Sequence, residues 1–334
     1  MENARQDDAS FRDPAGQVYR IGNRVLRTVT EIGAADYRFV RDSGFLPPLI
    51  AAGKIIDMTE VSPAQLGPVA EDVRYLLEHS RLPFISYPCE WCFPALQSAA
   101  LLQLDLLIEA LSHDVTLCDA SAYNVQFRGA RPVFIDALSF RRYREGAYWI
   151  AHQQFCDQFL NPLLLTALRG VAFNGWYRGS LDGIRSEDLN RLLPWYHKVN
   201  WRVLAHVTLP VRFQATARKK TAADTDRIKT RALPRSSFLH MIGGLRKWIA
   251  GLTSPQAAQS AWSGYAEDNV YDSQAADAKA AFTRRFASIV KPEMLWDIGC
   301  NTGIYSEIAL QSGAGQAVGF DSDPAAVGTA FARA

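Results

Sequence analysis

The stretch from 295 to 323 constrains the fold of this chain more than any other part of it. A short apolar run ends in Asp297, a glycine-spaced turn follows, and a helix-forming segment covers 304–310. A second apolar run, 317–320, ends in Asp321. The carboxyl ends of parallel strands meet at one edge of an open α/β sheet, which is where such sheets bind ligands. The stretch therefore predicts a strand–loop–helix–strand unit that holds a nucleoside.

The spacing of the glycines distinguishes two classes of nucleoside cofactor. A dinucleotide fingerprint reads G-x-G-x-x-G, and Asn301 and Ile304 occupy its second and third glycine positions. The spacing found here, D-x-G-x-x-x-G, resembles the first motif of class I S-adenosylmethionine-dependent methyltransferases, usually written D/E-x-G-x-G-x-G. Asn301 replaces the middle glycine of that motif, and Asn tolerates a positive φ better than most residues.

The resemblance implies a cofactor site in this chain. In that family the glycine loop wraps the amino-acid end of the cofactor, and the acid after the second strand binds the ribose. Carried over, the cofactor-binding residues for S-adenosyl-L-methionine are Asp297, Gly299, Asn301, Gly303 and Asp321. A helix over 277–289 is expected to lead into the first strand.

Length and composition exclude several other classes of protein. A chain of 334 residues with 48% hydrophobic content can bury two cores, and its net charge of +2 gives no strong signal for nucleic acid. The longest apolar run lies near 159–168, short of the ~20 residues that span a bilayer. Cys89 and Cys92 have metal-site spacing, but no second pair completes a four-ligand site. We expect a cytoplasmic protein with free thiols and no transmembrane segment.

The pattern along the chain predicts the following organisation. The expected elements are a hairpin over 17–29, a helix through 37–42, an extended piece over 54–61, a short strand at 83–88, an amphipathic helix over 95–112, helices over 147–207 with breaks at Pro162, Gly179 and Pro194, and a basic amphipathic helix over 238–252. The expected domains are 1–213, a charged linker at 214–236, and 237–334.

A second group of polar residues follows the helix at 95–112. Asp119 lies in a loop, Asn124 follows five residues later, and Asp136 ends the second of two short strands. Phosphoryl transfer needs a carboxylate near the attacking hydroxyl and oxygen ligands for magnesium. The order and spacing resemble the catalytic loop and metal-binding acid of protein kinases. The resemblance implies Asp119 as the catalytic base, with Asn124 and Asp136 as ligands of the magnesium that accompanies ATP.

The kinase resemblance is incomplete. Leu117 and Cys118 replace the usual His and Arg, and no glycine-rich phosphate loop is visible. Arg27 and Lys54 are the candidates for the cation that holds phosphates. Alternatively, Asp119 and Asn124 make turn hydrogen bonds that only shape the loop.

Nearly the whole chain, from 11–16 through 297–303, resembles a bacterial family of class I methyltransferases, some of them described as nodulation-related proteins of rhizobia. The resemblance implies an α+β kinase-like N-terminal domain followed by the first part of an α/β Rossmann-like methyltransferase domain. We expect a methyltransferase of unknown methyl acceptor, to which the kinase-like domain helps bind a substrate. The alternatives are a phosphotransferase and a non-catalytic binding protein. Because family members run longer, we expect this chain to be a fragment, inactive in methyl transfer and protease-sensitive over 295–334.

Overall fold

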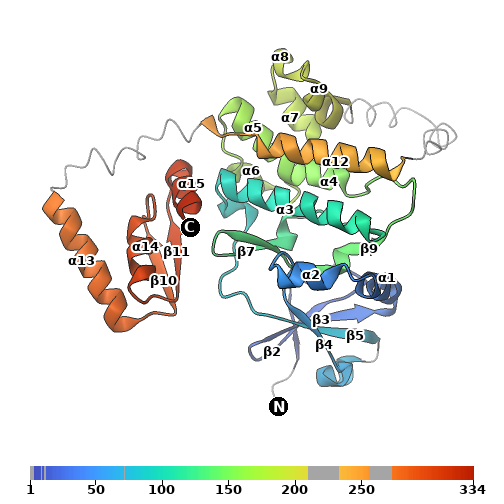
Figure 1. Ribbon diagram of the computed structural model, residues 1–334, viewed down its shortest axis with the longest axis horizontal. Helices are drawn as coiled ribbons and strands as arrows, with labels where there is room; N and C mark the ends of the chain where they lie inside the picture. The colour runs from blue at the N-terminus through green and yellow to red at the C-terminus, as the bar shows by residue number, and fades with distance from the viewer. Residues whose placement is uncertain (1–3, 9, 11–12, 71, 210–232, 256–272) are drawn as a thin grey trace.

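The computed structural model describes residues 4–8, 10, 13–70, 72–209, 233–255 and 273–334. Over these ranges the chain is a mixed α and β structure in two parts (Figure 1). The larger part contains an antiparallel sheet and a group of helices, and the smaller contains two parallel strands with helices around them. The mixed α+β character that the sequence predicts is confirmed.

The N-terminal sheet has the strand order β1-β2-β3-β5-β4 and is antiparallel throughout. Its strands are β1 (Arg5–Gln6), β2 (Val18–Ile21), β3 (Arg24–Thr30), β4 (Met58–Val61) and β5 (Val73–His79). The intervening helices are α1 (Glu31–Asp42), α2 (Leu46–Ala51) and the 3-10 segment η1 (Pro63–Ala70). The hairpin predicted over 17–29 is β2–β3, and Gly22 takes the positive φ of 57° that its tight turn requires. The extended piece predicted over 54–61 forms a strand only in its second half.

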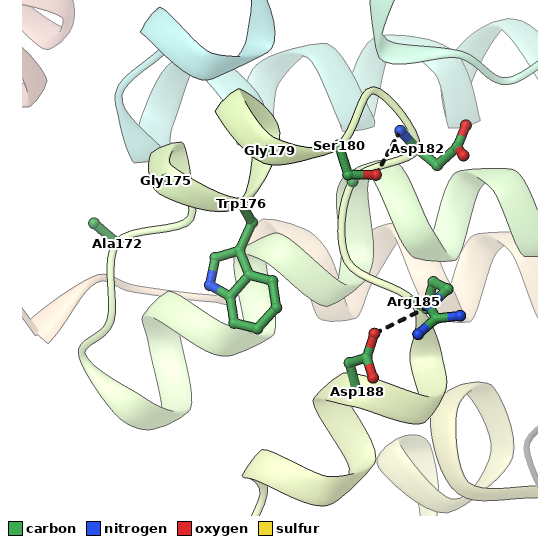
Figure 2. A pocket seen from close by; sticks show the side chains of 9 residues that line it. Ala172, Gly175, Trp176, Gly179, Ser180, Asp182, Arg185 and Asp188 are labelled. Carbon is green, nitrogen blue, oxygen red and sulfur yellow. Dashed lines mark hydrogen bonds and ion pairs between the residues drawn. The ribbon is translucent and has the colours of Figure 1, made fainter.

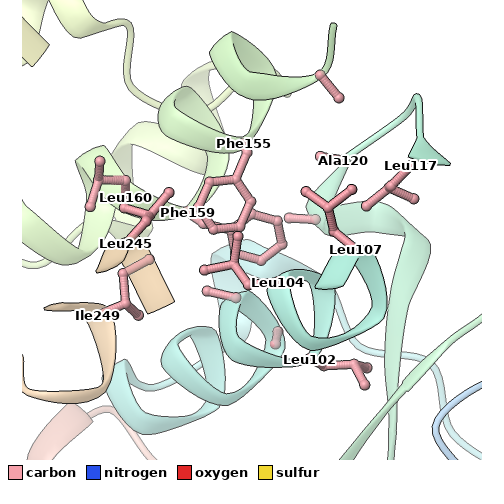
Figure 3. Close-up of a cluster of buried hydrophobic side chains, with 14 of the residues drawn as sticks. Leu102, Leu104, Leu107, Leu117, Ala120, Phe155, Phe159, Leu160, Leu245 and Ile249 are labelled. Atoms are coloured by element: carbon pink, nitrogen blue, oxygen red, sulfur yellow. The ribbon is translucent and has the colours of Figure 1, made fainter. Parts of the chain in front are cut away.

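Helix α3 (Phe93–Ser112) forms the centre of the larger core. The sequence predicts an amphipathic helix here, but Leu96, Leu104 and Leu107 are fully buried among residues that cover most of its surface. Figure 3 shows Leu104 and Leu107 beside Phe155 and Phe159, which come from the helices that cover α3. The helix is long and apolar enough to cross a membrane by length and composition, yet 61% of its most apolar stretch is buried inside this fold. Its apolar character is therefore explained by its place in the core, and the prediction that the longest apolar run lies at 159–168 is wrong.

The short strand predicted at 83–88 is not formed. This segment is irregular and ends in the 3-10 turn η2 (Pro88–Glu90). Pro83 and Pro88 supply no N–H for a strand ladder. The backbone of Ser86 instead bonds the side chain of Gln126, which accepts its N–H at 3.0 Å and donates to its carbonyl at 2.9 Å. A side-chain amide thus takes the place of a neighbouring strand.

The segment after α3 alternates short strands and tight turns, and the two strands that the sequence predicts here are β7 and β8. Its elements are β6 (Val115–Leu117), η3 (Ala122–Asn124), β7 (Val125–Arg128), β8 (Arg131–Phe134), η4 (Ala137–Ser139) and β9 (Phe140–Arg142). Strand β7 pairs with β8, and β6 pairs with β9, both antiparallel. The loops that carry Asp119, Asn124 and Asp136 lie between these strands.

Residues 152–208 are mostly helical. The elements are α4 (His152–Phe155), η5 (Cys156–Leu160), α5 (Asn161–Arg169), α6 (Asn174–Gly179), α7 (Ser186–Leu192), α8 (Trp195–Lys198), α9 (Trp201–Val203) and η6 (Leu204–Thr208), of which η5 and η6 are π-helical. Breaks at Gly179 and Pro194 are confirmed, but the break predicted at Pro162 is wrong. Pro162 lacks the N–H that would bond the Gln158 carbonyl. The Tyr177 hydroxyl donates to that carbonyl instead, so helix continues from α4 through α5.

Helix α12 (Arg235–Ala250) packs lengthwise against α3 (Figure 1). Phe238, Ile242 and Ile249 are fully buried there, and the Arg246 guanidinium donates to Asp105 at 2.9 Å. The sequence places this helix with the C-terminal domain, whereas its contacts are with the core of the larger part. Most of the predicted linker, 214–232, lies outside the described residues.

The smaller part is built on two parallel strands joined by a helix. Its elements are α13 (Ser273–Val290), β10 (Met294–Ile298), α14 (Ile304–Gln311), β11 (Gln316–Phe320) and α15 (Pro324–Arg333). The strands run in register from Met294 opposite Gln316 to Ile298 opposite Phe320. Helix α15 packs against α3, and Phe331 meets Phe127 edge-on at 5.8 Å. The strand–helix–strand unit that the sequence predicts is present, and β10 ends at Ile298, one residue after Asp297.

Candidate functional site

The loop after β10, residues 299–303, is here called the glycine loop. Gly299, Asn301 and Gly303 all have positive φ, at 74°, 48° and 78°. The N–H groups of Gly299 and Cys300 both donate to the Phe320 carbonyl, at 2.8 and 3.0 Å. These bonds hold the loop across the carboxyl ends of β10 and β11. Asn301 adopts the left-handed conformation of the glycine that it replaces in the predicted motif.

The two acids that the sequence singles out both lie near the glycine loop. One oxygen of Asp321 accepts the Asn301 N–H at 2.8 Å, and the other accepts the Asp323 N–H at 2.9 Å. Asp297 accepts the Ser306 hydroxyl from α14 at 2.6 Å. The structure therefore brings Asp297 and Asp321 together with the loop. Each carboxylate oxygen has two lone pairs, so these bonds leave acceptor capacity for a ligand.

The surroundings of the loop differ at its two glycines. A Cβ on Gly299 would meet nothing within 4 Å, so the space over this residue is open. A Cβ on Gly303 would lie 3.0 Å from the Ala330 Cβ, because α15 packs closely on the loop there. In addition, Asn301 Oδ1 is buried without a hydrogen-bond partner among the described residues. An open backbone approach beside an unsatisfied acceptor fits a ligand with hydrogen-bond donors.

The pKa of the Cys300 thiol reflects its burial and the negative charge around the loop. Burial is the main cause that raises the pKa of this thiol to about 11, and the nearby carboxylates of Asp297 and Asp321 contribute to the same rise. A Cβ on Gly319 would lie only 2.8 Å from the Sγ of Cys300. Gly319 in β11 is therefore needed for this packing, a role that the sequence analysis missed. A strand glycine opposite the predicted loop was the available signal.

Of the three kinase-like residues, Asp119 has one set of hydrogen-bond partners, and Asn124 and Asp136 share another. Asp119 accepts the Ser121 N–H at 2.9 Å and the Gln154 side-chain amide at 2.7 Å. The same Gln154 accepts the Ala120 N–H at 2.8 Å. Asp119 thus shapes its own loop, which is the alternative role that the sequence left open.

Asn124 and Asp136 meet through one hydroxyl. The Asn124 amide donates to Ser139 Oγ at 3.1 Å, and Ser139 donates to Asp136 at 2.9 Å. Arg27 on β3 lies 3.7 Å from Asp136 and also pairs with Asp13. Lys54, the other candidate cation, is exposed and lies in the segment that leads into β4. The structure thus places Arg27 rather than Lys54 beside the predicted metal-binding acid.

Two cavities of the described structure are lined by other residues than those of the two groups. One of about 520 Å³ lies between α6 and α7, and Figure 2 shows Trp176, Asp182 and the Arg185–Asp188 ion pair around it. Another of about 410 Å³ lies between α3 and α15. Neither is lined by a residue that the sequence assigns to a site.

One cluster of polar groups in the structure has no counterpart among the residues that the sequence singles out. His152, Cys156 and His206 each offer a ligand atom, and these atoms lie within 4.8 Å of one another. The spacing of His152 and Cys156, four residues apart on a helix, was the signal available in the sequence. His206 lies fifty-odd residues further along the chain, and no local pattern connects it to them.

Comparison with known proteins places the chain in a family. No protein-family model matches it. The solved structure of vaccinia related kinase 3 covers 43% of this chain and 48% of its own, with 13% identity and a TM-score of 0.27, a likeness too low to support an argument. The nodulation protein NoeA of Rhizobium meliloti (strain 1021) is 39% identical over 324 residues, which is 97% of this chain and 68% of that protein. The chain therefore belongs to the family of this nodulation protein.

Proposed function

We propose that the glycine loop and the two acids around it bind S-adenosyl-L-methionine, and that the chain is the cofactor-binding part of a class I methyltransferase. The observation that carries the proposal is the bond from the Asn301 N–H to Asp321. It joins the loop after the first strand to the acid after the second, which is where a nucleoside cofactor meets a sheet of this kind.

The charge of the site favours this cofactor over a dinucleotide. Asp297 and Asp321 lie beside the loop, and their negative charges would repel a pyrophosphate. S-adenosylmethionine instead carries a sulfonium and an ammonium, both cationic, and ribose hydroxyls that donate hydrogen bonds. Asn301 Oδ1, buried without a partner in the described structure, is an acceptor for such a donor.

The cofactor, when bound, supplies an electrophilic methyl group to an acceptor aligned with it. The residues of this chain hold and orient it. Asp321 accepts a ribose hydroxyl while keeping its bond to the loop, and Gly299 lets the cofactor approach the backbone closely because no Cβ stands in the way. Burial keeps the thiol of Cys300 protonated at neutral pH, so it does not compete as a nucleophile.

The acceptor-binding elements of such an enzyme belong to further strands of the sheet. Trp296 and Ile298 on β10 are 63% and 74% exposed, so one face of this strand is uncovered. Strand β10 pairs only with β11 among the described residues. We propose that the free edge of β10 is where a further strand pairs, and that the part of the chain before residue 256 binds a substrate or partner.

Equilibrium binding measured by titration calorimetry tests the proposal. We expect S-adenosylmethionine to bind and NAD not to bind. Asp321→Asn keeps the shape of the side chain but removes its charge, and it should weaken S-adenosylmethionine binding about tenfold or more, because hydrogen bonds to charged groups contribute about 1.5–3 kcal/mol. Glu293 is an exposed acid directly before the first residue of β10, at the end of the strand away from the glycine loop. Glu293→Gln should therefore bind S-adenosylmethionine as the unchanged chain does. Equal binding by Asp321→Asn, or none by the unchanged chain, would contradict the proposal.

A second candidate function is phosphoryl transfer at a kinase-like site. The observation in its favour is the approach of Arg27 to Asp136 at 3.7 Å, because protein kinases use a strand cation and a metal-binding acid on the same nucleotide phosphates. The Asn124–Ser139–Asp136 chain brings both predicted magnesium ligands together. Against it, Asp119 is engaged with Gln154, and Arg27 pairs with a second acid, Asp13.

Nucleotide binding separates this candidate from the first. A phosphotransferase should bind ATP with magnesium, and Asp136→Ala should abolish that binding without affecting S-adenosylmethionine. Ser139→Ala is the matched control for folding, since it removes the same bridge while leaving both ligands in place. ATP binding that persists in Asp136→Ala would rule out the kinase-like site.

A further inference from the structure

The pair of π-helical segments in the larger part of the molecule carries a cluster of two histidines and a cysteine. Cys156 is the first residue of η5, and His206 lies inside η6. His152 lies one helical turn before Cys156, so both side chains share a face of the helix. π-Helical turns are rare and occur frequently at functional sites. Here both of them contribute a residue to one cluster.

Two of the three distances within the cluster match the edges of a metal coordination sphere, and all three lie within 4.8 Å. His152 Nε2 lies 3.2 Å from His206 Nδ1 and 3.7 Å from Cys156 Sγ. Zinc binds histidine nitrogen at about 2.0–2.1 Å and thiolate sulfur at about 2.3 Å, in tetrahedral geometry. These lengths place two nitrogen ligands about 3.3 Å apart, and a nitrogen and a sulfur about 3.6 Å apart. Little movement of the side chains would admit an ion.

The surroundings suit a bound ion of this type. Cys156 and His206 are 1% and 8% exposed. Trp149 meets the ring of His152 edge-on, and Trp248 of α12 lies beside His206. Burial lowers the pKa of both histidines, that of His206 to about 4, so each ring is neutral at pH 7 and has a lone pair to offer. His152 is less fully buried than Cys156 and His206.

We propose that His152, Cys156 and His206 bind a zinc(II) ion, with water or an external ligand in the fourth position. On binding, the Cys156 thiol releases its proton to solvent and the thiolate forms the zinc–sulfur bond, while each histidine donates a lone pair without losing a proton. The ion ties η5 to η6 and closes a loop of about fifty residues. Three protein ligands and one open position are the pattern of zinc sites that bind or activate a further molecule.

Cobalt(II) substitution tests the site directly. The full chain, stripped with a chelator, should take up one cobalt ion and gain the near-ultraviolet absorption of a sulfur-to-cobalt charge transfer. Zinc should displace the cobalt and abolish that absorption. Wild-type protein without the absorption would overturn the proposal, and the 3.2 Å contact would then be a hydrogen bond between two histidines.

Two variants identify the ligands, and one serves as control. Cys156→Ser should lose the charge-transfer absorption, and His206→Gln should weaken zinc binding more than about 100-fold, since even indirect partners of metal ligands contribute 10–100-fold. Cys89→Ser removes a cysteine outside the cluster and should leave both properties unchanged. Circular dichroism checks that the variants fold. An undiminished charge-transfer signal in a folded Cys156→Ser protein would also overturn the proposal.

Discussion

The carboxylate of Asp321 accepts the backbone N–H of Asn301 at 2.8 Å and so fastens the loop after β10 to the end of β11. The residues are 20 positions apart in the chain, and α14 lies between them. The same carboxylate accepts the Asp323 N–H and thereby fixes the turn into α15. One side chain thus organises the glycine loop and the approach to the following helix. Both would have to be in place before a nucleoside could bind.

Asp321→Ala should loosen the glycine loop. The variant leaves the N–H groups of Asn301 and Asp323 without their acceptor, which should lower the free energy of local opening by about 1–3 kcal/mol. Amide hydrogen exchange of peptides covering 298–306 measures this opening. Asp297→Ala, which removes only the bond from Ser306, should leave the exchange of the Asn301 amide unchanged. Equal exchange of that amide in Asp321→Ala and the unchanged chain would show that the bond does not hold the loop.

The effect of a substitution at Asn301 on stability should depend on the backbone conformation there and not on the size of the side chain. At a φ of 48°, Asn301→Gly should be neutral or slightly stabilising, because glycine adopts this conformation without strain. Asn301→Ala should destabilise the smaller part by about 1–2 kcal/mol, the usual difference for a residue with a Cβ in the left-handed region. Denaturant unfolding followed by circular dichroism compares the two. A glycine variant less stable than the alanine variant would contradict the observed loop conformation.

Gly303 and Gly328 form a matched pair for testing how α15 packs. A Cβ on Gly303 would lie 3.0 Å from the Ala330 Cβ at a φ of 78°, so Gly303→Ala should displace α15 and destabilise the fold. A Cβ on Gly328, within α15, would lie 3.7 Å from Pro94, an ordinary contact. Gly328→Ala should therefore stabilise by about 0.5–1 kcal/mol, the helix preference of alanine over glycine. Thermal unfolding of both variants should shift in opposite directions, and a shift in the same direction would contradict the packing of α15.

Acid should destabilise the larger part through His79. Its Nδ1 is buried without a hydrogen-bond partner among the described residues, and desolvation lowers its pKa below the usual value of 6.5, against the opposing effects of the Asp57 backbone and Asp136. The unfolded chain therefore binds the proton more readily than the folded chain. The stability associated with a neutral, buried His79 is present above pH 6.5 and is lost as the pH falls below it. His152 and His206 act in the same direction.

The comparison of two proteins isolates the effect of His79. With a chelator present, the free energy of unfolding of the unchanged chain should fall between pH 7 and pH 5. His79→Gln should show a smaller fall over the same range, because glutamine takes up no proton. Denaturant titrations at each pH give both curves. Identical slopes would mean that His79 is as easily protonated in the folded state as in the unfolded one.

The parts of the fold that could be predicted from the sequence depend on local chemistry. The β2–β3 hairpin follows from its turn residues, and the β10–α14–β11 unit follows from apolar runs and glycine spacing. The strand expected at 83–88 fails because Gln126, 40 residues away, satisfies the backbone of Ser86. The break expected at Pro162 fails because Tyr177 takes up the freed carbonyl of Gln158. In both cases a distant side chain supplies what the local backbone lacks.

In the candidate sites, too, local patterns could be predicted from the sequence and contacts between distant segments could not. Asp297, Asn301 and Asp321 lie together as their spacing suggests, since one strand–helix–strand unit carries all three. The kinase resemblance implies one site for Asp119 and Asp136, and in the structure Gln154 from α4 bonds the first and Arg27 from β3 approaches the second. The cluster of His152, Cys156 and His206 depends on how η5 and η6 pack, which no local pattern encodes.

Hydrogen exchange of the glycine loop with and without cofactor tests the central claim most directly. If S-adenosylmethionine binds where we propose, peptides covering 298–306 and 320–323 should become protected on its addition, and NAD should protect neither. The Asp321→Asn variant should lose that protection at the same cofactor concentration. Protection confined to other parts of the chain, or none at saturating cofactor, would contradict the assignment of the glycine loop as a methyltransferase cofactor site.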